Sequence, residues 1–432
     1  MDLPPPLSAA DKNSFAYPTI KDRLPVILAK IADLLFRTRE QIKSQYKEDV
    51  ADELKSIVGS VSKLRNEVQT NKVAIPLTGN RSDTNIWNQF LKEVTEREGT
   101  PPSWFKSPWL YMECYMYRRI QESVEKCSVL KEFDVFGEQK EKSFNDSEFA
   151  SGVLMMHLLE TEKNIKDDPG RVPGAFTQFL KICLWGNKCD LSISGGADNA
   201  QTSSPLEQLT HLEPYMLIDE AALVLKHFQT ENKKCGRVDI VLDNAGFELM
   251  SDLCFAEFLL CSGLCSTVHF HAKAFPWFVS DVTKMDFDWT LQMLGQINHI
   301  AMSEFSNRWN GRLSNGTWTF QAHHFWTMPF DYSQMKTYAP DLYETLKKSD
   351  MIFLKGDLNY RKLLGDLKWS STTAFETCLR GFHPAPLCVL RTSKSDVLVG
   401  LKEGRAEEVQ KIDEDWMVNG KWGVINTSFK SA

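Results

Sequence analysis

The segment VDIVLDNAGFELMSD, residues 238 to 252, constrains the fold and function of this chain more than any other. Its apolar, β-branched run predicts a buried strand, and Gly246 before a helical pattern predicts a tight strand-to-helix turn. Asp243 and Asn244 would then lie at the carboxyl end of that strand, with Glu248 on the following helix. Ligands bind at this edge of open α/β sheets, because strand ends and helix N-termini converge there. We therefore expect a ligand site around Asp243 and Asn244.

The pattern of the chain changes near its middle. Four stretches before this point repeat apolar positions at helical spacing: 20 to 70, 86 to 128, 150 to 166 and 175 to 186. After a segment rich in Gly, Ser and Asn at 192 to 205, strand-like runs alternate with helical ones, which is typical of a parallel sheet. The expected strands are VDIVLD, STVHFHAKA, TWTFQAHHFW, MIFLKG, LCVLRT and WGVINT. We predict an α/β protein with a mainly parallel sheet over 205 to 432 and an all-helical N-terminal domain over 1 to 195.

Charge and composition argue against two classes of function, nucleic-acid binding and membrane association. The net charge of −7 and the lack of a long Lys/Arg block argue against nonspecific nucleic-acid binding. The N-terminus lacks the basic start and apolar core of a signal peptide, and the longest apolar run, 253 to 265, is interrupted by Glu257. We therefore expect no membrane association and a cytoplasmic or nuclear location.

Asp243, Asn244 and Asp281 suggest a hard-metal site. Carboxylate and amide oxygens favour Mg²⁺, Mn²⁺ or a related divalent ion that keeps open water positions. Asp281 follows the second expected strand and its loop, a position that could bring it beside Asp243. The alternative is that Asp243 and Asn244 only cap the next helix.

Two further strand ends carry groups that could bind an anion. In the first, Lys355 and Gly356 are followed by Asp357, Leu358, Asn359, Tyr360 and Arg361, where a helix begins. Backbone N–H groups and an arginine could hold an anion at such a place. In the second, Arg391 and Lys394 follow the next strand, and a lysine could neutralise a phosphate. The alternative for both segments is that the charges are solvated in loops.

Two other motifs have structural explanations. Asp286-Phe-Asp288-Trp-Thr290 matches the nucleophile motif of haloacid-dehalogenase phosphatases, but no buried strand precedes it, so helix capping is the favoured explanation. His269 and His271 have the same-face spacing of a strand metal pair, which a polar strand face explains equally well. The sequence has neither a G-x-x-x-x-G-K-[ST] phosphate loop nor a G-x-G-x-x-G fingerprint.

Four ordered motifs resemble the metal-dependent damage-control phosphatases. They are LDNAGFEL at 242 to 249, the downstream Asp281, KGDLNYRKL at 355 to 363 and RTSK at 391 to 394. The resemblance covers essentially the whole chain. It implies a Rossmann-like sheet with a helical domain, and divalent-ion binding, commonly Mn²⁺, Co²⁺ or Ni²⁺, by Asp243, Asn244 and Asp281.

The resemblance also implies a substrate and substrate contacts. Glu248, the segment from Asp357 to Arg361, and Lys394 would contact the substrate, and the RTSK tetrapeptide matches the sugar-phosphate branch. Members of that branch hydrolyse fructose 1-phosphate and fructose 6-phosphate. Vertebrate members of the branch are also described as protein-glutamate O-methyltransferases, which implies an alternative activity with S-adenosylmethionine as cofactor and a protein as substrate.

Overall fold

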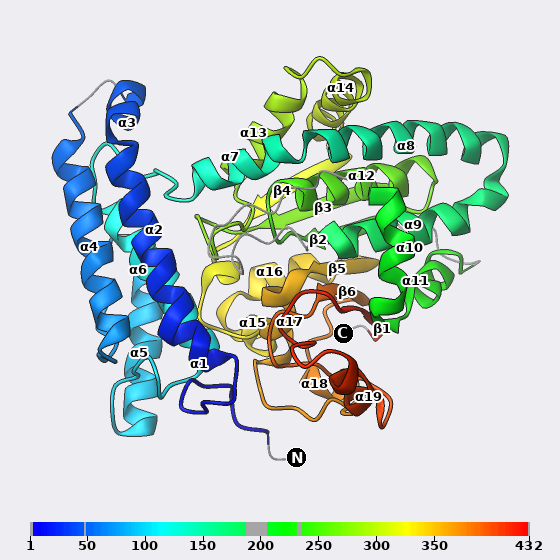
Figure 1. Cartoon of the computed structure of the whole chain (residues 1–432). Helices are drawn as coiled ribbons and strands as arrows, with labels where there is room; N and C mark the ends of the chain where they lie inside the picture. Colours follow the sequence, from blue (N-terminus) through cyan, green and yellow to red (C-terminus); the bar gives the residue numbers. More distant parts are fainter. Residues whose placement is uncertain (1–2, 47–48, 187–204, 231–235, 431–432) are drawn as a thin grey trace.

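The computed structural model describes residues 3–46, 49–186, 205–230 and 236–430 (Figure 1). Within these residues, seven strands form one sheet in the order β1-β7-β6-β5-β2-β3-β4. Neighbouring strands are parallel except for β6 and β7, which are antiparallel. The strands are β1 (Met216–Asp219), β2 (Arg237–Val241), β3 (Thr267–Ala272), β4 (Trp318–Ala322), β5 (Met351–Lys355), β6 (Leu387–Thr392) and β7 (Gly423–Ser428). The predicted fold class, α/β with a mainly parallel sheet, is confirmed.

All six expected strands are present, and one more was missed. The missed strand, β1, is four residues long, partly exposed, and pairs only with β7 at the edge of the sheet. The fourth expected strand is shorter than predicted, because the chain turns into a 3₁₀-helix at His324–Thr327. The expected seam at 192 to 205 falls almost entirely outside the described residues, so the division into two domains stays a prediction.

The N-terminal part of the chain is helical, and Figure 1 shows it as a bundle beside the sheet. A short α1 (Ala16–Pro18) leads into a π-helix at Thr19–Arg23. The bundle continues with α2 (Leu24–Arg37), α3 (Arg39–Tyr46), α4 (Ala51–Gln69), α5 (Thr84–Glu98) and α6 (Trp109–Glu125). In α2 the buried positions Leu24, Ile27, Leu28, Ile31 and Leu35 follow helical spacing, so one face of the helix enters the core.

Helices cover both faces of the sheet. The remaining helices are α7 (Gly137–Asp146), α8 (Glu148–Asp167), α9 (Val172–Gly186), α10 (Pro205–Leu212), α11 (Ala221–Phe228), α12 (Phe247–Cys261), α13 (Lys284–Leu294), α14 (Ile300–Ser314), α15 (Met335–Tyr338), α16 (Pro340–Leu346), α17 (Gly356–Leu364), α18 (Phe375–Cys378) and α19 (Arg405–Ile412). Both α8 and α9 pack against α12. None of the helices within the described residues is long and apolar enough to cross a bilayer.

The alternation of side chains along the strands divides the apolar interior into two cores. In β5, Met351 and Phe353 join a core with α8, α9 and α12, whereas Ile352 and Leu354 join the core of the N-terminal bundle. Successive side chains of a strand point to opposite faces, which produces this division. The sheet and the bundle therefore share one continuous apolar core.

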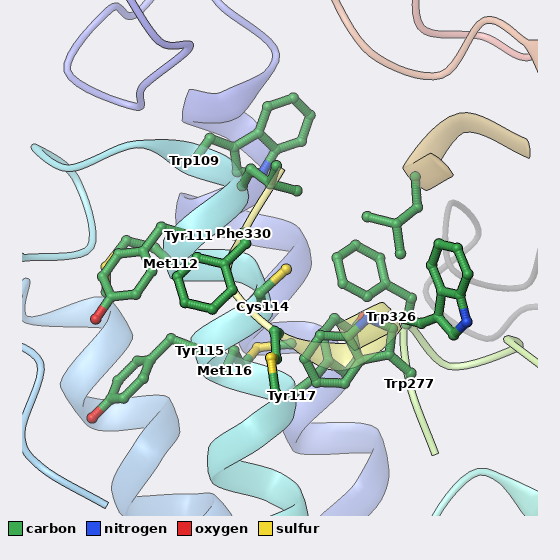
Figure 2. Packing of buried hydrophobic residues seen from close by; sticks show 14 of the residues in the cluster. Trp109, Tyr111, Met112, Cys114, Tyr115, Met116, Tyr117, Trp277, Trp326 and Phe330 are labelled. Carbon is green, nitrogen blue, oxygen red and sulfur yellow. The ribbon is translucent and has the colours of Figure 1, made fainter. Parts of the chain in front are cut away.

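Helix α6 links the bundle to the sheet, and most of its residues are buried. Figure 2 shows Tyr117 of this helix close to Trp277, which lies in the loop after β3, and their ring centroids are 5.8 Å apart. Tyr117 stacks on Phe278 with ring centroids 4.6 Å apart. This packing places one end of the bundle against the loops that follow the strands.

Candidate active site

The predicted site lies where the strand order reverses. After β2 the chain adds β3 and β4 on one side, then returns to place β5 on the other side of β2. The carboxyl ends of β2 and β5 therefore flank the switch point, the place where open α/β sheets bind ligands. Asp243 and Asn244 follow β2, and Asp357 follows β5.

Backbone pairing brings Asp281 to the end of β2. Asn244 and Asp281 form an isolated antiparallel bridge. Beside it, the N–H of Val282 donates to the carbonyl of Asp243 at 2.8 Å. The sequence prediction that Asp281 approaches Asp243 thus agrees with the geometry.

The loop before Asp281 has an uncommon backbone. Phe278 and Val279 have φ of 45° and 71°, values that non-glycine residues and above all β-branched ones rarely adopt. The N–H of Asp281 donates to the carbonyl of Trp277 at 3.1 Å, which closes the loop. Strained backbone of this kind persists only where surrounding contacts hold it, and it clusters at functional sites.

The donor set at this point suits a hard divalent ion. Asp243, Asn244 and Asp281 are buried and line one small cavity, and their side chains carry the carboxylate and amide oxygens that such an ion prefers. The amide oxygen of Asn244 accepts from Ser280 Oγ. Lys273 Nζ lies 3.0 Å from Asp281 Oδ2 and offsets part of the negative charge. The described residues contain no group of three or more His, Cys, Asp or Glu side chains that could hold a metal. A divalent ion bound here would therefore be held by two carboxylates, the Asn244 amide and water molecules.

The structure places Glu248 behind Asn244, rather than in the cavity where a substrate contact was predicted. Glu248 is fully buried, and its Oε2 accepts from Asn244 Nδ2 at 2.7 Å. Lys355 Nζ lies 2.9 Å from Glu248 Oε1 and 2.7 Å from Asp252 Oδ1. Burial by itself would lower the pKa of Lys355, but the two carboxylates raise it above its ordinary value. Glu248 therefore orients the Asn244 amide, and Lys355 holds Glu248.

The segment after β5 divides between the cavity and the core. Asp357, Leu358 and Arg361 line the cavity. Asn359 and Tyr360 are fully buried and do not line it, which differs from the predicted substrate contacts. Positions three and four apart share a helix face, so a helix starting at Gly356 cannot present five consecutive side chains to one ligand.

Arg361 is balanced by carboxylates of its own protein. Its Nε and Nη2 donate to Asp366 at 2.8 and 2.9 Å, and its Nη1 donates to Glu113 at 2.7 Å. The guanidinium also lies over the Trp109 ring, 3.6 Å from the centroid. Three of its five N–H donors are therefore directed at protein groups, and the expectation that this arginine also holds an anion stays a prediction.

The RTSK segment is anchored on Asp357. Arg391 is fully buried, donates from Nε to Asp357 Oδ1 at 2.7 Å and lies over the Tyr360 ring. The backbone N–H of Lys394 donates to the same carboxylate oxygen at 3.2 Å. Arg391 thus positions the loop, and its contact with a ligand stays a prediction, whereas Lys394 lines the cavity.

The cavity also has residues from the N-terminal helices. Its volume is about 30 Å³, and it is lined by Arg23, Trp109, Glu113, Asp243, Asn244, Phe278, Asp281, Asp357, Leu358, Arg361 and Lys394. Since about 10–15 Å³ of such space holds one water molecule, the cavity has room for only a few waters, and a sugar phosphate requires lining side chains to move apart.

None of Arg23, Trp109, Glu113 and Phe278 was among the site residues predicted from the sequence, although all four line the cavity. A charged residue such as Glu113 within the otherwise apolar run WLYMECYM is a local signal of a functional position. Arg23 had no comparable signal, because it lies among ordinary helix charges.

The structure supports the structural explanations for the two other motifs. Thr283 and Asp286 form a capping box at the start of α13. His271 Nε2 lies 2.6 Å from a buried Asp239 carboxylate, so it pairs within the sheet. Helix capping does not explain Asp243, because Gly246 is the N-cap of α12 and no side chain caps it. A Cβ at Gly246 would lie 2.6 Å from Ser143 Oγ, which explains the glycine.

Known proteins match the chain over nearly its full length. The family model of the damage-control phosphatase ARMT1-like domain matches residues 19–409. "Damage-control phosphatase ARMT1" of Xenopus laevis is 47% identical over 437 aligned residues, covering 99% of each chain. The human protein of the same name is 43% identical, covering 98% of each. A crystal structure of a DUF89 family protein from Pyrococcus horikoshii is 14% identical, with a TM-score of 0.40, covering 82% of this chain and 94% of its own. The family model and the two relatives confirm the resemblance carried by the motifs, and the chain belongs to the damage-control phosphatase ARMT1-like family.

Proposed function

We propose that this chain is a divalent-metal-dependent phosphatase that hydrolyses sugar phosphates, with fructose 1-phosphate and fructose 6-phosphate as the expected substrates. Family membership makes it an enzyme of the phosphatase class. One observation carries the finer proposal. The oxygen ligands Asp243, Asn244 and Asp281 line the same small cavity as Lys394, so a metal and a cation can act on one phosphate.

Asp243, Asn244 and Asp281 would hold the ion, and Mn²⁺, Co²⁺, Ni²⁺ and Mg²⁺ all suit oxygen ligands of this kind. When bound, such an ion polarises a phosphoryl oxygen and lowers the pKa of a coordinated water. The Lys394 ammonium offsets charge that develops on the transferring phosphoryl group. Of Asp243 and Glu248, Asp243 is the one that lines the cavity and could accept a proton from water, since Glu248 lies behind Asn244.

The first prediction tests the reaction itself. Metal-replete protein is expected to release free phosphate from fructose 1-phosphate or fructose 6-phosphate, and a chelator is expected to stop the release. The reason is that the oxygen ligands lie next to Lys394 and no phosphate loop is present. The measurement is free phosphate across a panel of phosphate esters, with each of the four metals added in turn.

The same samples test the alternative, glutamate O-methyl transfer, by following labelled methyl from S-adenosylmethionine into protein carboxylates. A sulfonium methyl group is already activated and needs no Lewis acid, so methyl transfer would survive chelation. Methyl ester formation without phosphate release in metal-replete protein would contradict the phosphatase proposal and favour the methyltransferase.

The second prediction concerns Lys394. Lys394→Ala is expected to lower turnover of fructose 1-phosphate at least tenfold, about 1.4 kcal/mol, while the metal stays bound. The loss follows from removing the RTSK cation that lines the cavity. Steady-state kinetics and elemental analysis measure the two effects. Lys402→Ala, at an exposed position further along the chain, is the control. Turnover close to wild type in Lys394→Ala would show that this lysine does not act on the phosphate.

A further inference from the structure

One carboxylate oxygen in the cavity wall accepts no hydrogen bond within the described residues. The Glu113 side chain is 1% exposed, and its Oε2 accepts from Arg361. Its Oε1 makes no hydrogen bond within the described residues. Burying a carboxylate oxygen without a hydrogen-bond donor costs free energy. Such an oxygen therefore usually accepts a hydrogen bond from a ligand or a water molecule.

Arg23 lies on the same side of the cavity. Its Nη1 is 4.0 Å from Glu113 Oε1, too far for a direct hydrogen bond, but a hydroxyl group beside the two atoms could bond to both. Arg23 ends the π-helix at Thr19–Arg23, a backbone form that is frequent at functional sites. Trp109, four residues before Glu113 on α6, also lines the cavity, and its indole N–H has no partner among the described residues.

The charge of Glu113 decides which end of a phosphate ester can approach this wall. A phosphate carries at least one negative charge, which a buried carboxylate repels. A hydroxyl group, in contrast, donates to a carboxylate and accepts from a guanidinium or an indole N–H. The phosphate belongs with Lys394 and the metal ligands, so the wall built from the N-terminal helices faces the alcohol part of the ester.

We propose that Glu113 and Arg23 form the subsite for the hydroxyl groups of the sugar. The N-terminal helices then set substrate selectivity, and the loops of the sheet carry out the hydrolysis. This inference rests on the proposed phosphatase function and deepens it: the preferred substrates are phosphate esters of uncharged, hydroxyl-bearing alcohols. A site that hydrogen-bonds a substrate hydroxyl discriminates strongly against an analogue that lacks it, because the buried partner is left unpaired.

The third prediction tests this subsite with two esters. We compare kcat/KM for fructose 1-phosphate and for phenyl phosphate, which has no hydroxyl group, in metal-replete wild type, Glu113→Gln and Arg23→Gln. Both variants are expected to lower the ratio of the two kcat/KM values, sugar over phenyl, at least tenfold, mainly through KM. Arg119→Gln is the matched control, because Arg119 is also on α6 but binds Glu67 and Tyr115 outside the cavity. Its ratio is expected to stay within about twofold of wild type.

The outcomes separate the subsite from the proposed function. Equal losses on both esters in Glu113→Gln and Arg23→Gln would show that they act through Arg361 or the fold, and would overturn the subsite alone. Wild-type protein that hydrolyses neither ester would overturn the phosphatase function. Arg23 is 15% exposed and not part of the core, so Arg23→Gln decides the question if Glu113→Gln fails to fold, as a thermal melt would show.

Discussion

Asp243→Ala is expected to lose the bound divalent metal and to reduce phosphate release by roughly a thousandfold or more, since metal catalysis contributes several kcal/mol. The carboxylate lies directly after β2, is 4% exposed, and lines the cavity together with Asp281. Removing it leaves one carboxylate and one amide, so the ion loses one of its two charged protein ligands and is expected to bind much more weakly. Asp281→Ala is expected to behave in the same way.

Elemental analysis of the purified variants and a free-phosphate assay measure both effects, and circular dichroism checks the fold. Asp288→Ala is the control, because this carboxylate pairs with Lys284 on the exposed side of α13. It should keep both metal and activity. Full metal occupancy in Asp243→Ala or Asp281→Ala would remove that residue from the ligand set. Loss of activity in Asp288→Ala would instead revive the haloacid-dehalogenase explanation of its motif.

Lys355→Met is expected to lower the free energy of unfolding by about 3–5 kcal/mol, the usual cost of leaving a buried charge without its partner. Lys355 pairs with both Glu248 and Asp252, and all three side chains are buried. Metal affinity is expected to fall as well, because Glu248 would no longer hold the Asn244 amide in place.

Urea denaturation and calorimetric metal titration measure these two effects of Lys355→Met. Lys347→Met is the control, since Lys347 forms an exposed ion pair with Glu344. Such a pair contributes less than about 1 kcal/mol to the free energy of unfolding. Adding Asp252→Asn to Lys355→Met should recover part of the lost stability, because it removes one of the two unpaired charges. A Lys355→Met protein as stable as wild type, with unchanged metal affinity, would show that the network does not position Asn244.

Local sequence patterns predicted most of the sheet. Five of the six expected strands match within one or two residues at each end, because long β-branched runs bounded by turn residues carry a strong local signal. β1 was missed because a four-residue, half-exposed edge strand has no such signal. The metal ligands were also predicted from local sequence, since the hypothesis needed only the residue type and its position at a strand end.

The sequence by itself determined the α/β class, the strand-end position of Asp243, Asn244, Asp357 and Lys394, and the kind of chemistry that oxygen ligands beside a cation can perform. Each of these follows from periodicity and turn chemistry within a few residues. The tertiary structure decided which members of each motif enter the cavity, because helix geometry turns Asn359 and Tyr360 into the core and buries Glu248 behind Asn244. It also decided that Arg23, Trp109 and Glu113 form one wall, since packing alone joins segments more than a hundred residues apart.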